Sequence, residues 1–274
     1  MKADQTVTGA QTLLRALDVL ECLAKEPSWL TVAEVSELIG LKRATTYRLI
    51  KALESRGYVV VDSQRRFGLG GAILHLAAVI LKRNQSLVEL ASPTLEKLRD
   101  LTRETVSLQT VVGDERICLA EFVSKQPMRM ESGVGQVYPL YAGAAGKALL
   151  AWLPDRIQVI REHARDKSFL APMASATIRD VEVLTAELEQ IRGQGFATSN
   201  SEVVEGATSV AVPVFDENGA IRAVINVTGP ASRWSPERQE EFRWAILREA
   251  QLLGHLLGSP VPADMRVGQA ANLA

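Results

Sequence analysis

Positive charge is concentrated in one short stretch of this 274-residue chain, where it could bind phosphate groups. Between Gly40 and Arg66, seven lysines and arginines stand against two acidic residues, a local net charge of about +5. The whole chain has a formal net charge of -1, so the remainder is acidic. Cations gathered in one segment suit contact with a nucleic-acid backbone, because attraction to phosphate is needed only where the backbone passes. A solvated charged face is the alternative that charge alone leaves open.

A second group of residues has the chemistry of a small-molecule site. In the segment AIRAVINVT, a spacing of two puts Asn226 and Thr228 on one face of an otherwise hydrophobic strand. Ser209 lies in the apolar segment before it, so these polar groups could hydrogen-bond a carboxylate or hydroxyl of a small acid. A solvated sheet face would carry the same residues, and this alternative also stays open.

The sequence lacks the residue patterns of common catalytic, metal and cofactor sites. GAAGKALL has Tyr141 where a phosphate-binding loop needs glycine, and Ala148 where it needs Ser or Thr. The three histidines are scattered, and no Gly-x-Ser-x-Gly, HxxxH or CxxC spacing occurs. We therefore expect neither an enzyme nor a bound metal or cofactor.

The composition predicts a soluble protein of two domains. Hydrophobic residues make up 47% of the chain and charged residues 23%. The longest apolar run, Ala72 to Leu81, is broken by His75 and is far shorter than the roughly 20 residues that a bilayer requires. The N-terminus has no apolar signal core, and the two cysteines, Cys22 and Cys118, fall in segments that should form a helix and a strand. We expect a cytoplasmic location.

Three helices and a hairpin should present the basic segment. The first helix, residues 12–26, has an apolar stripe of Leu13, Leu17, Leu20 and Ala24. Thr31 and Glu34 form a capping box, so a second helix should begin at Val32 and end near Ile39, before Gly40. The third, residues 43–57, should bury Tyr47, Ile50 and Leu53 and turn outward Arg43, Thr45, Thr46, Arg48 and Lys51.

The segments YVVV and RFGL around DSQRR predict a hairpin with Arg65 and Arg66 near its tip. Two helices about a glycine turn, followed by such a hairpin, make a winged helix-turn-helix. Its third helix enters the major groove, where Arg43 or Arg48 would meet guanine edges. The expected DNA-binding residues are Thr31, Lys42, Arg43, Ala44, Thr45, Thr46, Tyr47, Arg48, Lys51, Arg65 and Arg66. A winged module used only for protein contacts is the alternative.

The next segment, GGAILHLAAVILKR, is apolar almost all round, so a helix there must be buried against something. A partner subunit is the natural candidate, because a homodimer reads a palindrome with two modules. Packing on the chain's own second domain is the alternative. A further helix, residues 88–101, should follow after Pro93 or across a break there.

The remaining segments predict an antiparallel sheet with helices. Strands are expected at TVSLQTVV, RICLAEFV, ATSVAVPVF and AIRAVINVT, with another at MRMESGVG. Helices are expected at GKALLAWL, at residues 180–192, and from the Ser235-Pro236 start to about Leu257. We expect a DNA-binding domain at 10–70, a connecting helix at 71–86, an effector domain at 87–258 and a loose tail at 259–274.

The order and spacing of several stretches resemble the IclR family of bacterial transcriptional regulators. These are RALDVLECLA, LTVAEVSELIGLKRATTYRLIKALESRGYV, FGLG, PLYAGAAGKALLAWL and GFATSNSEVVEGATSVAVPVFDENGAIRAVINVTGPASRW, so the resemblance covers roughly residues 10–257. It implies an α+β protein: an N-terminal winged helix-turn-helix, a connecting helix, and a C-terminal GAF-like effector domain with an antiparallel sheet.

The resemblance also implies effector-binding positions on a strand end, on the loop before EGATS and on the turn before the GKALLA helix. In this chain they are Ala144, Ala145, Ser199, Asn200, Glu202, Ser209, Asn226 and Thr228. Backbone N–H groups at the start of that helix would favour an anionic group.

Two functions follow as expectations. The first is a sequence-specific, ligand-responsive regulator of a catabolic operon, which binds double-stranded operator DNA as a homodimer or dimer of dimers and senses a small organic acid. The alternative is an intracellular small-molecule-binding protein whose winged module mediates protein contacts.

Overall fold

A computed structural model describes residues 10–26, 28–154, 160 and 170–259, and the side chains of residues 80–86 are not described. The chain divides into two compact units, residues 1–85 and 86–274. The expected tail, 259–274, lies outside the described residues except for Ser259, which is buried.

The first unit contains three helices and a two-stranded sheet. The elements are α1 (Gln11–Lys25), α2 (Val32–Leu38), α3 (Arg43–Ser55), β1 (Val59–Val61) and β2 (Phe67–Leu69). β1 and β2 pair antiparallel, and Leu30 adds a bridge to Phe67 beside them. The core consists of Val19, Cys22, Leu23, Leu30, Val35, Leu49, Ile50, Val59 and Phe67. The winged helix-turn-helix predicted from the sequence is therefore confirmed.

Local signals set the ends of the helices as predicted. Thr31 and Glu34 form the expected capping box, in which the Glu34 N–H donates to Thr31 Oγ1 at 3.3 Å and the Thr31 N–H to Glu34 Oε2 at 2.7 Å. Gly40 adopts a φ of 66°, a conformation that suits glycine, so the chain turns there before α3 begins.

The predicted facings of two helices are wrong in part. On α1, Leu13 and Leu17 are 61% and 46% exposed, and the buried residues are Val19, Cys22 and Leu23. α1 carries apolar residues on more than one side, so periodicity alone does not select the packed face. On α3, Tyr47 is 48% exposed and Thr46 is fully buried, the reverse of the expectation. Thr46 lies one turn before buried Ile50, so the two share the packed face of α3.

α4 (Gly71–Thr102) is a single helix of 32 residues that continues through Pro93, so no break occurs there. In its apolar N-terminal part, Leu74 is 74% exposed and Leu76 and Val79 are each 50% exposed. What covers this part of α4, a partner subunit or the chain's own second domain, stays a prediction.

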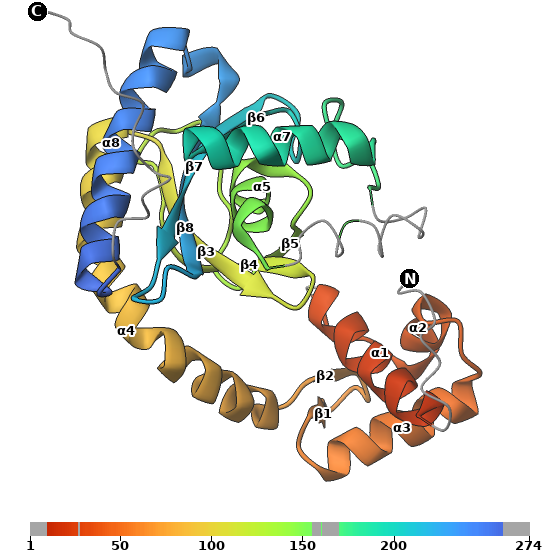
Figure 1. Cartoon of the computed structure of the whole chain (residues 1–274). Helices are drawn as coiled ribbons and strands as arrows, with labels where there is room; N and C mark the ends of the chain where they lie inside the picture. The colour runs from red at the N-terminus through yellow and green to blue at the C-terminus, as the bar shows by residue number, and fades with distance from the viewer. Residues whose placement is uncertain (1–9, 27, 155–159, 161–169, 260–274) are drawn as a thin grey trace, which may run out of the picture. The chain divides into compact units, whose positions relative to one another are not determined.

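The second unit is built on one antiparallel sheet in the order β5-β4-β3-β8-β7-β6. The strands are β3 (Thr105–Val112), β4 (Glu115–Phe122), β5 (Val137–Pro139), β6 (Ala197–Asn200), β7 (Ala207–Phe215) and β8 (Ile221–Pro230). α8 (Pro236–Leu256) and the C-terminal part of α4 pack on one face of the sheet. α5 (Gly143–Trp152) and α7 (Val181–Gln194) cover the other face (Figure 1). The predicted α+β class is confirmed.

Most of the predicted elements of this unit are present, and three differ. Residues 128–135 form no strand, and Gly133 and Gly135 there have φ values of 76° and 84°, which interrupt extended backbone. The edge strand is instead β5. β6 occupies the segment that was expected to be a loop around Ser199 and Asn200. α5 begins at Gly143, three residues before the expected GKALLAWL segment.

Within the described residues, none of the helices has both the length and the hydropathy to span a lipid bilayer.

Two neighbouring glycines after β2 allow a matched test of packing in the first unit. A Cβ on Gly70 would lie 2.2 Å from the Gly57 carbonyl oxygen and 3.0 Å from the Tyr58 carbonyl carbon, whereas a Cβ on Gly71 meets nothing within 4 Å. Backbone atoms cannot move aside as a flexible side chain can. We expect Gly70→Ala to lower the free energy of unfolding of the first unit by about 1–3 kcal/mol. Gly71→Ala should leave it unchanged, and equal unfolding curves for the two variants in urea would contradict this packing.

Candidate functional site

The outer face of α3 carries uncommitted positive charge. Arg43 and Arg48 are exposed, and neither makes an ion pair with any residue that the structure describes. Lys42 is the N-cap of α3 and Ala44 is exposed beside it, while Thr45 is half-buried. None of the described side chains caps the first turn of α3, so its N–H groups and the helix dipole favour a phosphate there.

Two residues farther along α3 contact each other. The Lys51 ammonium lies 5.9 Å from the centre of the exposed Tyr47 ring and 2.7 Å from Glu54 Oε2. The hydrogen bond to Glu54 raises the pKa of Lys51. Lys51 is therefore partly neutralised before any DNA approaches.

The structure gives the two wing arginines different surroundings. Arg65 is exposed at the turn, with a φ of 60°. Arg66 Nε lies 2.8 Å from Asp62 Oδ2, and the backbone N–H groups of Gln64 and Arg66 donate to Asp62 Oδ1. These contacts lower the pKa of Asp62, with the backbone N–H of Arg66 the largest cause. Of the two, Arg65 is the cation available to a phosphate.

Two other expected DNA contacts have structural roles. The hydroxyl of Thr46 is fully buried and donates to the Lys42 carbonyl at 3.3 Å, so the side chain cannot face a DNA groove, and the expected outward position of Thr46 is wrong. Thr31 uses both its backbone N–H and its hydroxyl in the capping box of α2.

A polar cavity of about 80 Å³ opens on the second unit, on the sheet face that carries α5. Six of the eight expected effector positions line it: Ala144, Ala145, Ser199, Ser209, Asn226 and Thr228. Asn200 and Glu202 do not line it. Strand register explains the gathering, because Ser199 pairs with Ser209, and Ser209 with Thr228, across neighbouring strands.

Among the described residues, the hydroxyls in the cavity have hydrogen-bond partners, whereas the amide oxygen of Asn226 has none. Ser199 Oγ and Ser209 Oγ lie 3.1 Å apart, and the Thr228 hydroxyl donates to the Thr208 carbonyl at 3.2 Å. Asn226 is 4% exposed, and its Oδ1 accepts no hydrogen bond from the described residues. A buried acceptor without a donor is costly, so Asn226 is poised for a ligand group.

Sequence reasoning missed the charged group of this cavity. Arg116, on β4, is 5% exposed and lines the cavity together with Gln109 and Tyr138. Burial lowers the pKa of Arg116 to about 10, so it remains charged at neutral pH. A lone arginine in the segment RICLAEFV suggests a solvent-facing position, and only the sheet order shows it enclosed beneath β5 and α5.

Glu202 holds the start of α5 rather than the cavity. Its Oε2 accepts from the Gly143 N–H at 2.9 Å, and its Oε1 lies 2.5 Å from the Lys147 ammonium, which is 1% exposed. Lys147 also contacts Glu187, which lies on α7. The expected anion-binding N–H of Gly143 is therefore occupied by a carboxylate of the protein itself.

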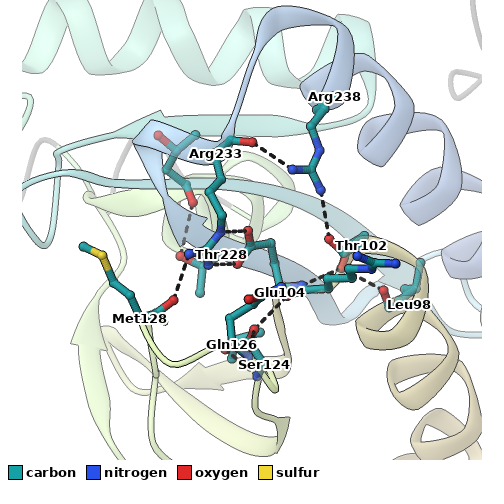
Figure 2. Close-up of polar contacts among 12 residues, drawn as sticks. Leu98, Thr102, Glu104, Ser124, Gln126, Met128, Thr228, Arg233 and Arg238 are labelled. Atoms are coloured by element: carbon teal, nitrogen blue, oxygen red, sulfur yellow. Dashed lines mark hydrogen bonds and ion pairs between the residues drawn. The ribbon is translucent and has the colours of Figure 1, made fainter.

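A second buried carboxylate, that of Glu104, holds the segment that follows β8. Figure 2 shows Arg233 facing Glu104, with Nε to Oε1 at 2.7 Å and Nη2 to Oε2 at 2.6 Å, while Nη1 donates to the Met128 carbonyl. Arg238 joins the Arg233 carbonyl to the Thr102 carbonyl at the end of α4. The cavity residue Thr228 lies in the same cluster (Figure 2).

The winged helix-turn-helix with an exposed basic helix, joined in one chain to an α+β unit with a cavity lined by polar and apolar residues, defines the class as a helix-turn-helix transcriptional regulator. Residues 12–63 match the IclR helix-turn-helix domain, and residues 80–254 match the family described as bacterial transcriptional regulator IclR C-terminal. The chain belongs to the IclR family of bacterial transcriptional regulators, which are regulators of transcription and not enzymes.

Individual relatives agree over most of the chain. The HTH-type transcriptional repressor AllR of Klebsiella pneumoniae is 31% identical over 266 residues, which cover 93% of each protein. The HTH-type transcriptional regulator KdgR of Escherichia coli (strain K12) is 30% identical over 241 residues, 87% of this chain and 89% of KdgR. The crystal structure of the Thermotoga maritima IclR is 29% identical with a TM-score of 0.65, covering 90% of this chain and 99% of that one.

The buried Lys147 can be tested by substitution. Lys147→Met leaves Glu202 buried without its cation, and we expect a loss of about 3–5 kcal/mol in the free energy of unfolding at neutral pH. Glu187→Gln should cost only about 1 kcal/mol, because the Glu187 side chain is 30% exposed and Lys147 keeps Glu202.

The loss in Lys147→Met should depend on pH. Burial raises the pKa of Glu202, and without Lys147 the influence that lowers it is removed. A carboxyl group with a raised folded-state pKa binds its proton more tightly in the folded chain, so folding gains stability as the pH falls through that pKa. The difference between Lys147→Met and the parent in urea unfolding should therefore shrink from about pH 7.5 to about pH 5. A constant difference would show that Glu202 is not the group left uncompensated.

Proposed function

We propose that the protein is a ligand-responsive regulator of a catabolic operon that binds double-stranded operator DNA in a sequence-specific manner and senses a small organic acid. Residues 10–70 bind DNA, residues 71–86 connect, and residues 87–258 form the GAF-like sensor. The protein acts in the cytoplasm as a homodimer or dimer of dimers on palindromic or repeated half-sites. The single observation that supports DNA binding best is that Arg43 and Arg48 are exposed on the outer face of α3 and make no ion pair with the part of the chain that the structure describes.

The α3 face supplies two kinds of contact. Arginine binds guanine O6 and N7 with two parallel hydrogen bonds, so Arg43 and Arg48 carry the base readout. Lys42, Ala44 and Thr45 at the start of α3, with the N–H groups of its first turn, position the phosphate backbone. Tyr47, Lys51, Arg65 and Arg66 flank this face, and Thr31 caps the start of α2. Thr46 is left out of the DNA contacts because it is buried.

The sensor proposal rests on the cavity. Ala144, Ala145, Ser199, Ser209, Asn226 and Thr228 surround a space that suits a small polar molecule, as expected from the sequence. Asn200 and Glu202 are not proposed as direct contacts, because neither lines the cavity. Ligand binding would reach α4 through the residues at its C-terminal end, since Thr102 bonds Arg238, and Arg238 bonds Arg233.

DNA recognition can be measured without knowing the operator. Sequences bound by the full chain are selected from a random duplex pool, and the affinity for the selected duplex is followed by fluorescence anisotropy at several salt concentrations. We expect a steep fall in affinity with salt, because bound counterions are released from the DNA. Arg43→Ala and Arg48→Ala should each weaken binding about 10- to 100-fold and relax the selected sequence.

Arg248→Ala serves as the control. It removes the same charge from α8, where the Arg248 side chain is 65% exposed, and should bind the duplex like the parent. If Arg43→Ala and Arg48→Ala also bind like the parent, α3 is not the reading helix.

A further inference from the structure

We propose that Arg116 selects the ligand of the cavity, and that this ligand is a small acid with one carboxylate, bound by Arg116, and a hydroxyl group, bound by Asn226. The inference deepens the proposed sensing function and rests on it. The sequence did not predict these two roles. It did not single out Arg116, and it gave Asn226 only as one of several polar groups of the site.

Arg116 is a buried cation that makes no direct ion pair with the described residues, although the charge of Glu202 acts on it from a distance and raises its pKa. Its Nη1 donates to Gln109 Oε1, its Nε to the Pro139 carbonyl at 3.3 Å and its Nη2 to the Ala142 carbonyl at 3.2 Å. All three acceptors are neutral, and among the described residues no carboxylate lies within ion-pair distance of Arg116. A guanidinium has five N–H groups, so two remain for a ligand.

The acidic residues nearest the cavity are already committed to other cations. Glu131 lines the cavity, but its Oε1 lies 2.7 Å from Arg129 Nε. Glu202 is bound by Lys147 and by the Gly143 N–H. A charge buried at 5% exposure normally requires a partner, and none of these carboxylates supplies it. A carboxylate of a bound molecule would supply the direct partner that Arg116 lacks among the described residues.

The guanidinium is held in place before any ligand binds. Gln109 presents its Oε1 to Arg116 because its Nε2 donates to Ser107 Oγ at 2.9 Å. The Tyr138 ring lies 4.9 Å from the guanidinium carbon, and the Tyr138 hydroxyl is fixed by the Ser132 carbonyl at 2.8 Å. Such preorganisation is what a carboxylate site needs, because little side-chain entropy is lost on binding.

Asn226 provides the hydrogen-bonding group for the hydroxyl of the ligand. It lies on β8, separated from β4 by β3, so its amide and the Arg116 guanidinium approach the same cavity from strands two places apart in the sheet. Its Oδ1 lacks a donor among the described residues. A hydroxyl can donate to Oδ1 or accept from Nδ2, so it suits either end of the amide. A carboxylate alone cannot donate, and would leave this acceptor unsatisfied.

The charge balance limits the ligand to one carboxylate. Arg116 is the one cationic side chain among the described residues that line the cavity. A second carboxylate would be placed near Glu131, without a cation of its own. The volume of about 80 Å³ further restricts the ligand to a small molecule.

The test uses the full chain and a fixed panel of probes. Glycolate, lactate, 2- and 3-hydroxybutanoate, glycerate and mandelate are each compared with the corresponding acid without a hydroxyl and with the corresponding primary amide. Binding is measured by thermal shift and by titration calorimetry. We expect at least one hydroxy acid to bind, and its deoxy and amide counterparts to bind about 10-fold or more weakly.

Three variants assign the two roles. Arg116→Gln should lower the affinity for the acid about 100-fold. Arg116→Lys should lower it less, because lysine keeps the charge but cannot form two parallel hydrogen bonds as the planar guanidinium does. Asn226→Leu, of similar size, should make the hydroxy acid and its deoxy counterpart bind equally. Arg248→Gln, which removes an exposed charge on α8, should bind the acid like the parent.

Failure of this inference is separable from failure of the proposed function. Urea unfolding of Arg116→Gln like that of the parent shows that the second unit is folded, and binding of the selected DNA in the absence of acid shows that the reading helix is intact. If DNA is bound but no hydroxy acid of the panel binds, or if amides bind as well as acids, or if Arg116→Gln binds the acid like the parent, this inference is overturned alone. If the parent binds no DNA, the proposed function fails.

Discussion

The carboxylate of Glu104 is the buried charge on which the second unit is organised. It receives both prongs of the Arg233 guanidinium, and this one arginine also bonds the Met128 carbonyl, so the end of α4, the segment after β8 and the loop after β4 meet at one point. Glu104 is 1% exposed, and a buried pair that loses one partner leaves a charge that water cannot reach. The backbone is adapted to it as well, because a Cβ on Gly229 would lie 2.5 Å from Glu104 Oε2.

Three buried charges in this unit differ in whether the chain supplies a counter-charge, and this difference separates a structural role from a binding role. Glu104 has Arg233, and Lys147 has Glu202 and Glu187, so both sites are closed within the chain. Arg116 is equally enclosed, but it has only neutral acceptors among the described residues. A buried charge that is paired within the chain stabilises the fold. A buried charge beside a cavity that lacks such a pair can bind a molecule of opposite charge.

Local signals in the sequence predicted the architecture well. Thr31 and Ser235 each cap a helix at the expected residue, because capping depends on side chains next to the helix end. Strands such as β3 and β8 were also predicted, because the alternation of apolar and polar residues along a strand is a local feature of the sequence. Spacing alone pointed to Ser209, Asn226 and Thr228, and the family resemblance added Ala144, Ala145 and Ser199. These six line the cavity from four different elements.

Properties that depend on tertiary contacts were not predictable in the same way. Thr46 and Tyr47 are adjacent, and which of them faces the core depends on the placement of α1 and α2 against α3. β6 is only four residues long and gains its strand conformation by pairing with β7. Arg116 is an unremarkable basic residue in the sequence, and its significance appears only when β5 and α5 enclose it.

The burial of Lys147 has a chemical consequence. Amine-reactive reagents and acylating enzymes attack the free base of an accessible lysine, and an ammonium that is 1% exposed and held by two carboxylates is shielded from both. The lysines at positions 42, 51 and 97 all lie at the surface, whereas Lys147 remains unlabelled for as long as its contacts with Glu202 and Glu187 hold.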